Sequence, residues 1–175
     1  MSEQNRNLWA PWRLEYIRGL GGAEDGGCFL CRYAGHPDQD GENRVIWRGA
    51  ACLTVFNQFP YNNGHLLIAP QAHLAELEEL DDAALTELIR TIRDAKRLLQ
   101  GALGAHGFNV GMNFGRCAGA GLPGHLHVHI VPRWEGDTNF MPVVGDTRVI
   151  SQSIEAVHQQ MRRAADELGL PPVRG

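Results

Sequence analysis

The sequence predicts one α+β domain built on an antiparallel sheet of about five strands, with one long helix and a C-terminal helix. The 175 residues fit a single domain of ordinary size. Short apolar runs rich in strand-forming residues follow one another along the chain, and two other segments repeat apolar residues at helical spacing. Strands that are neighbours in sequence, with one helix inserted between them, favour the α+β class.

The first three strands are expected in residues 44–69. The runs VIW and CLTVF are separated by Arg48 and Gly49, which predicts a hairpin of two strands over residues 44–56. A third strand is expected over residues 65–69, and Pro70 ends it.

Two helices are expected from the apolar periodicity. The longer covers residues 81–101, where Asp81 and Asp82 stand near the N-terminus and favour the helix dipole. Its repeating apolar residues are Leu85, Leu88, Ile89, Ile92, Leu99 and Leu103. The second helix covers residues 154–168, with Gly169 as its C-cap.

Two further strands are expected over residues 108–113 and 126–132, on either side of the glycine-rich turn GRCAGAGLPG. The chain then divides into an N-terminal extension (1–27), a core that carries the motifs (28–140) and a C-terminal strand and helix (141–175). All three parts are expected to belong to one domain.

Composition and charge exclude several classes of protein. With 43% hydrophobic and 21% charged residues, the chain is not wholly disordered. A formal net charge of −4 leaves no general basic face for nucleic acid. The N-terminus lacks the pattern of a secretory signal, and no apolar run approaches the roughly 18 residues of a membrane span. We therefore expect a cytoplasmic protein that binds neither nucleic acid nor membranes.

His125, His127 and His129 form the most informative pattern of the chain, in GHLHVHIVPRW. Alternate side chains of a strand share a face, so three imidazoles are expected on one side and the intervening apolar residues on the other. A solvated strand face that carries histidines by chance is the simpler alternative. The other five histidines are spread over the rest of the chain, which argues against such a chance cluster.

This row of histidines suits two kinds of chemistry. Neutral imidazole is a good nucleophile at pH 7 that attacks phosphorus, and protonated imidazole then leaves readily. One histidine would attack while its neighbours manage protons and charge. Alternatively, the three rings would bind a catalytic metal, as in a zinc hydrolase.

The segment HLHVHIV resembles the motif of the histidine triad family of nucleotide hydrolases and transferases, in which three histidines alternate with apolar residues. The resemblance extends to FNQFPYNNGHLLIAPQAH and FNVGMNFG upstream. Two further segments, NLWAPWRLEYI and HIVPRWEGDTNFMPVVGDTRVI, look like the bacterial branch that includes diadenosine tetraphosphate phosphorylases. The family's fold is the α+β domain expected above.

The resemblance implies roles for the active-site histidines. His127, the middle histidine of the triad, is the expected nucleophile, which takes the nucleoside phosphate onto its ring nitrogen. His129 is expected to contact the phosphate or the leaving-group oxygen. His65 is expected to complete the site by a hydrogen bond to His127 that fixes its tautomer.

The resemblance also implies substrate contacts. Asn57 matches a position that binds the ribose, and Asn113 matches one near the α-phosphate. The loop that contains Gly119, Gly121 and Gly124 comes directly before the triad, where backbone N–H groups could cradle a phosphate. The family often has Gln where this chain has Gly121, and the loop here is one residue longer, which bears on the preferred leaving group or acceptor.

Cys28 and Cys31 have the C-x2-C spacing of a zinc knuckle, but a tetrahedral site needs two more ligands. The resemblance points to His73 and His125, so that His125 would be structural. A reduced pair without metal and a redox pair are the alternatives. Cys52 and Cys117 are expected to be ordinary buried thiols.

The implied activity is nucleotidyl transfer at the α-phosphate of an adenine dinucleoside polyphosphate, through a covalent nucleotidyl-histidine and with no catalytic metal. With inorganic phosphate as acceptor, diadenosine tetraphosphate gives ATP and ADP, whereas water gives AMP. A homodimer is also implied. The alternatives are a hydrolase of dinucleoside polyphosphates or adenosine phosphoramidates, and a nucleotide-binding sensor with slow turnover.

Overall fold

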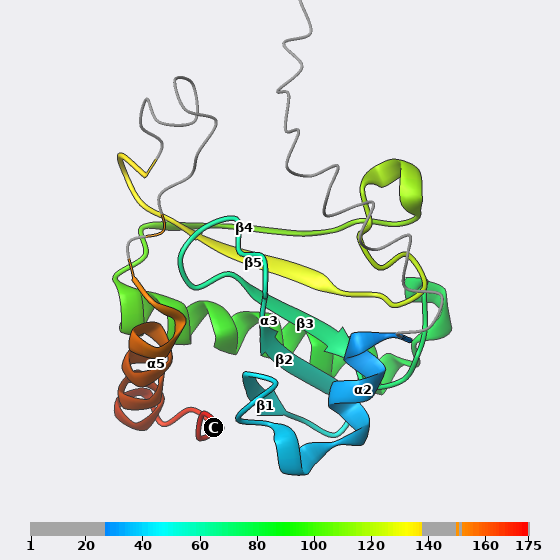
Figure 1. Cartoon of the computed structure of the whole chain (residues 1–175), viewed down its shortest axis with the longest axis horizontal. Helices are drawn as coiled ribbons and strands as arrows, with labels where there is room; N and C mark the ends of the chain where they lie inside the picture. The colour runs from blue at the N-terminus through cyan, green and yellow to red at the C-terminus, as the bar shows by residue number, and fades with distance from the viewer. Residues whose placement is uncertain (1–26, 138–149, 151, 175) are drawn as a thin grey trace, which may run out of the picture.

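The computed structural model describes residues 27–137, 150 and 152–174 (Figure 1). The described chain forms one antiparallel sheet of five strands in the order β1-β2-β3-β5-β4. This sheet and its helices confirm the predicted α+β class and the number of strands. β5, which contains the last histidine of the triad, lies between β3 and β4.

The five strands lie close to their predicted positions. They are β1 (Val45–Arg48), β2 (Cys52–Phe56), β3 (Leu66–Pro70), β4 (Gly107–Met112) and β5 (Val128–Arg133). Pro70 is the last residue of β3 and pairs with Cys52, beyond the part of β3 that pairs with β5. β5 begins at Val128 rather than at the expected residue 126. His125 and His127 therefore lie before the regular strand.

The two long helices, α3 (Asp82–Leu103) and α5 (Ile154–Leu168), confirm the predicted periodicity. The side chain of Asp81 accepts a hydrogen bond from the N–H of Ala84 and caps α3. Gly169 ends α5 in the left-handed conformation, as expected for a glycine C-cap. A short helix, α2 (Phe29–Gly35), was not among the predicted elements and begins directly after Cys28.

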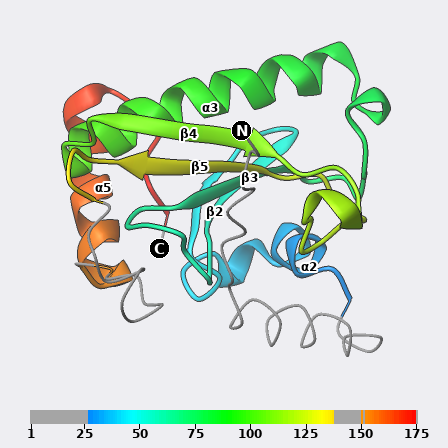
Figure 2. The ribbon, with the colours of Figure 1, turned by 90° about the horizontal axis from the view of Figure 1, so that it is seen from above.

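The helices cover the two faces of the sheet differently. Figure 2 shows α3 lying along one face and α2 on the opposite side. Val128 and Ile130 of β5 pack in the core on the α3 side, together with residues of α5. Leu30 of α2 packs with Leu67 of β3 in a second, smaller cluster. The sheet is therefore buried on both faces near its centre.

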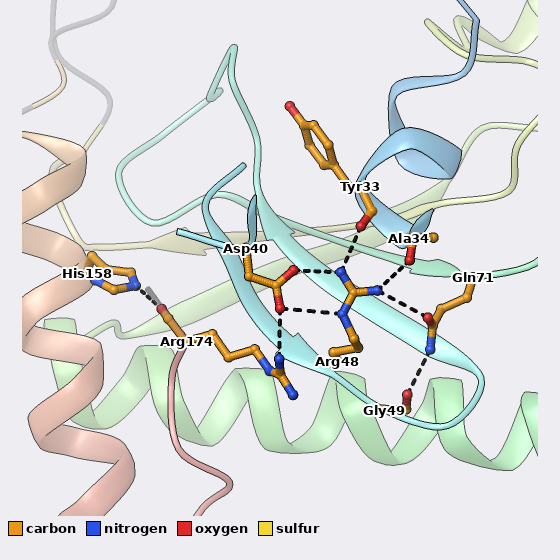
Figure 3. Close-up of polar contacts among 8 residues, drawn as sticks. All are labelled: Tyr33, Ala34, Asp40, Arg48, Gly49, Gln71, His158 and Arg174. Carbon is orange, nitrogen blue, oxygen red and sulfur yellow. Dashed lines mark hydrogen bonds and ion pairs between the residues drawn. The ribbon is translucent and has the colours of Figure 1, made fainter. Parts of the chain in front are cut away.

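An ion-pair network centred on the buried Asp40 lies at the β1 edge of the sheet (Figure 3). Asp40 bridges two guanidinium groups, with N–O distances of 2.6 Å to Arg48 and 2.9 Å to Arg174. Arg48 also donates to the carbonyl oxygens of Tyr33 and Ala34 at the end of α2. The network ties the segment after α5 and the end of α2 to strand β1.

Several predicted features lie outside the described residues. These are most of the N-terminal extension, with NLWAPWRLEYI, and residues 138–149, which include much of the expected C-terminal strand. Within the described residues, no helix has both the length and the apolar character needed to cross a bilayer. Cys52 is buried as expected, but Cys117 is exposed, because it lies in the short 3-10 helix η3 (Arg116–Ala118) within the glycine-rich turn.

Candidate active site and metal site

The triad histidines lie on the face of the sheet opposite α3. Leu126, Val128 and Ile130, which alternate with them, are all buried. Opposite His129, strand β3 places Leu67, which belongs to the cluster beside α2. The alternation predicted from the sequence thus separates an apolar face from a row of imidazoles.

The ring of His127 is held in one tautomer by the backbone. Its Nδ1 lies 2.8 Å from the carbonyl oxygen of His125. A carbonyl oxygen only accepts, so Nδ1 carries the proton and the neutral ring has its lone pair on Nε2. His127 is buried, with 7% of its surface exposed. This residue therefore has the nucleophilic nitrogen that attack on phosphorus requires.

His65 lies directly before β3 and contacts the third triad histidine. Its Nε2 is 3.0 Å from Nδ1 of His129. This corrects the expected hydrogen bond between His65 and His127, because His127 is oriented by the backbone instead. Gly64 brings the chain to this point with a positive φ of 72°, and a Cβ there would lie 2.5 Å from a side-chain carbon of Leu103.

The loop before β3 surrounds His65 with donors. The N–H of Tyr61 donates to Nδ1 of His65 over 3.0 Å. The amide nitrogen of Asn57 is 3.2 Å from Nδ1 and 3.4 Å from Nε2, so that it lies over the ring rather than in its plane. Burial, with His129 and His127 nearby, lowers the pKa of His65 to about 3. His65 is therefore neutral at pH 7.

Cys28, Cys31, His73 and His125 converge into one cluster, as the sequence analysis expected. Their possible ligand atoms all lie within 4.8 Å of one another. Nδ1 of His125 is 3.1 Å from the sulfur of Cys28 and 3.5 Å from that of Cys31. These separations are close to the roughly 3.5 Å edge of a tetrahedral zinc site with nitrogen and sulfur ligands.

The chemistry of the four donors fits a cation. Nε2 of His125 donates to the carbonyl oxygen of Pro70 over 2.8 Å, which leaves the lone pair of Nδ1 aimed at the two sulfurs. Burial and the neighbouring Cys28 thiol raise the pKa of Cys31 to about 11. A bound divalent cation would remove this penalty, because metal coordination deprotonates a thiol. The cluster is a possible metal site.

A family model described as the HIT domain matches residues 39–136 of the chain. An AP-4-A phosphorylase of Mycobacterium tuberculosis is 38% identical over 154 residues, which are 86% of this chain and 79% of that protein. The chain belongs to the HIT family.

Further HIT proteins are similar over shorter or more divergent alignments. A bis(5′-nucleosyl)-tetraphosphatase [asymmetrical] of Schizosaccharomyces pombe is 32% identical over 54% of this chain and 52% of that protein. The crystal structure of a hypothetical histidine triad nucleotide-binding protein from Sulfolobus tokodaii has a TM-score of 0.63 and 26% identity, over 81% of this chain and 93% of that one. These comparisons agree with the fold described above.

The remaining substrate-binding residues predicted for this HIT protein lie in the segment between β4 and β5. Asn113 directly follows β4 and is half-buried, and Gly119 and Gly121 lie in the turn between β4 and β5. Gly124 instead lies against the possible metal site, because a Cβ there would be 3.6 Å from Nε2 of His73. The roles of these residues in binding phosphate stay predictions.

Tyr61 contacts the candidate active site and was not among the residues predicted from the sequence. Its ring centroid is 4.7 Å from that of His65 and 5.6 Å from that of His129. In the sequence, the only signal is an aromatic residue four positions before a histidine that follows Asn-Gly. That signal gives no hint that the ring turns back onto the triad.

Proposed function

We propose that this HIT protein phosphorolyses diadenosine tetraphosphate to ATP and ADP through a covalent nucleotidyl-His127. The observation that carries the proposal is the fixed tautomer of His127, which leaves the lone pair on Nε2 as the nucleophile. The substrate class is supported by the AP-4-A phosphorylase of M. tuberculosis, which is similar over 86% of the chain.

The reaction has two displacements at the same phosphorus. In the first, Nε2 of His127 bonds to the α-phosphorus, the bond to the bridging oxygen breaks, and ATP departs with that electron pair. His127 keeps its proton on Nδ1, where the carbonyl oxygen of His125 stabilises the positive charge of the substituted ring. In the second, an oxygen of inorganic phosphate attacks the same phosphorus, ADP forms, and neutral His127 is restored.

A hydrolase is the second candidate. If water replaces phosphate in the second displacement, the products are AMP and ATP. This candidate is favoured by the similarity to the S. pombe tetraphosphatase, although that alignment covers only about half of each protein. Both candidates share the first displacement, so they differ only in which acceptor reaches the nucleotidyl-His127.

Zinc is the metal we propose for the cluster of Cys28, Cys31, His73 and His125. Two thiolates and two imidazoles form a closed tetrahedral set, which is typical of structural rather than catalytic zinc. When bound, zinc would cross-link α2 to the segments that carry His73 and His125. His125 would hold the ion through Nδ1, while its carbonyl oxygen orients His127.

The quaternary structure, location and domain organisation of the chain belong to the same proposal. We expect a homodimer in the cytoplasm, with residues 1–175 forming one domain. Size-exclusion chromatography with light scattering tests the dimer, since a mass of one chain would contradict it.

Product analysis tests the proposed function. The purified protein is incubated with diadenosine tetraphosphate, with and without inorganic phosphate, and the nucleotides are separated chromatographically. The proposal predicts ATP and ADP that appear only with phosphate. AMP and ATP formed without phosphate would support the hydrolase instead, and no turnover would favour a binding protein. His127→Ala, run in parallel, excludes a contaminating enzyme.

A further inference from the structure

The hydrogen bonds around His65 run in one direction. The N–H of Tyr61 can only donate, so Nδ1 of His65 must accept, and neutral His65 carries its proton on Nε2. That proton faces Nδ1 of His129 over 3.0 Å, which must therefore accept as well. Neutral His129 is left with its proton on Nε2, away from His65.

This chain of hydrogen bonds opposes protonation of His129. A second proton on Nδ1 of His129 would bring two N–H groups face to face at 3.0 Å. His65 cannot yield by moving its proton to Nδ1, because the N–H of Tyr61 already occupies that position. The amide nitrogen of Asn57, held by a hydrogen bond from the N–H of Phe59 to its oxygen, adds another N–H dipole against the ring of His65.

The ring of Tyr61 holds both imidazoles in place. It lies nearly parallel to His129, with an interplanar angle of 23°, and also packs against His65. Across the sheet, His129 pairs with Gly111 of β4 and Leu67 of β3, so neither neighbouring strand sets a charged side chain directly opposite it. Tyr61 thus contributes its backbone N–H as a hydrogen-bond donor to His65, and its ring packs against both imidazoles.

We propose that Tyr61 is a positioning residue that acts through His65 to present His129 to the substrate as a neutral hydrogen-bond donor, which restricts the site to leaving groups that depart as anions. This inference rests on the proposed function and deepens it. A neutral His129 stabilises a departing oxygen through its Nε2–H without giving up the proton, as neutral imidazole does in other active sites.

The chemistry of the leaving group follows from this arrangement. When the P–O bond of a dinucleoside polyphosphate breaks, the electron pair stays on a phosphate oxygen, whose conjugate acid has a pKa of about 6. No proton is needed at pH 7. When a P–N bond of a phosphoramidate breaks, the departing amine needs a proton, since its basic nitrogen has a pKa near 10. A neutral His129 supplies none, so polyphosphates are favoured.

The first test is spectroscopic and needs no substrate. In full-length protein labelled with ¹⁵N in its histidines, the proposal predicts at pH 7 a proton on Nε2 and none on Nδ1 for both His65 and His129. His127 should show the opposite tautomer and serves as an internal reference. A proton on Nδ1 of His129, in either the neutral or the charged ring, would overturn the proposal.

The second test compares Tyr61→Leu with Tyr61→Phe. Loss of the aromatic wall should lower kcat for diadenosine tetraphosphate roughly tenfold, with KM within about twofold, which corresponds to one weakened hydrogen bond. Tyr61→Phe keeps the wall and should restore kcat. Ile89→Ala, which truncates a large exposed side chain on α3, is the control and should match wild type. Unchanged kcat in Tyr61→Leu would contradict the assignment of Tyr61 as a positioning residue.

The third test compares leaving groups in the wild-type protein. The ratio kcat/KM for an adenosine 5′-phosphoramidate should be at least roughly tenfold below that for diadenosine tetraphosphate, because general acid catalysis is missing. Equal ratios would refute the restriction on leaving groups. If wild type turns over neither compound, the proposed function fails, whereas the histidine tautomers still decide the role of Tyr61.

Discussion

Nε2 of His65 lies 3.0 Å from Nδ1 of His129, and this contact joins the loop before β3 to strand β5. The two residues are 64 positions apart in sequence. They are brought together because β3, which follows His65, pairs directly with β5, which contains His129. Because the N–H of Tyr61 fixes the proton of His65, the contact also sets the tautomer of His129. The candidate active site is thus defined by proton positions as well as by the spacing of the triad.

His127→Ala should abolish nucleotidyl transfer while nucleotide binding survives. The variant lacks the attacking nitrogen, and we expect turnover to fall by at least about 10³-fold, as for other enzymes that lose their nucleophile. Steady-state kinetics and calorimetric titration with a nucleotide measure the two effects. His36→Ala removes an exposed histidine at the end of α2 and should leave both unchanged. Near-normal turnover in His127→Ala would contradict the covalent mechanism.

His65 should make the stability of the protein depend on pH. Its pKa is about 3 in the folded protein, below the ordinary value of 6.5, so the unfolded chain binds this proton first as the pH falls. The contribution of neutral His65 to the free energy of unfolding is complete above pH 6.5 and is lost as the pH falls from 6.5 toward 3. Between pH 7.5 and 5, urea unfolding should show wild type losing about 2 kcal/mol more than His65→Gln. Equal losses would show that His65 is already charged at pH 5.

Metal content should depend on Cys31 but not on Cys117. Cys31→Ser removes one of the four clustered donors, and the purified variant should contain less than half of the wild-type zinc by elemental analysis, measured per chain. Its free energy of unfolding should fall by at least about 3 kcal/mol, because structural zinc sites contribute directly to folding. Cys117→Ser changes an exposed thiol and should match wild type. Equal zinc in both variants would exclude the proposed ligand set.

Asp40→Ala should destabilise the edge of the sheet strongly. The Asp40 and Arg48 side chains are only 7% and 12% exposed, so the change leaves a buried guanidinium without its carboxylate. Breaking such a pair costs about 3–5 kcal/mol, whereas an exposed pair contributes about 1 kcal/mol or less. Asp94→Ala, which removes a partner of the exposed Arg93, is the matched control. Similar losses of unfolding free energy in the two variants would show that burial of the Asp40 network is unimportant.

Local patterns in the sequence predicted most of the fold. The alternation around the triad, the helical period over residues 81–101 and Gly169 as a C-cap all correspond to observed features. Short-range physics dominates in each case, because side-chain direction, helix dipole and backbone conformation depend on near neighbours. The start of β5 was less predictable, since the alternation of histidines with apolar residues begins at His125, three residues before the regular strand.

Contacts between distant segments could not be predicted in the same way. Asp40 and Arg174 are 134 positions apart, and no periodic pattern in the sequence links them. The partner of His65 was predicted wrongly for a related reason. The resemblance placed His65 at the site, but whether its ring reaches His127 or His129 depends on the pairing of β3 with β5 and on the loop that contains Tyr61.

The most direct test of the covalent mechanism is to locate the nucleotidyl group on the protein. Wild-type protein is mixed with diadenosine tetraphosphate labelled at the α-phosphate, without inorganic phosphate, quenched in base within milliseconds, and digested for peptide mapping. The covalent mechanism predicts label on the peptide that contains His127, and added phosphate should remove this label as ADP. Products that form at the same rate with no label on any histidine peptide would contradict it.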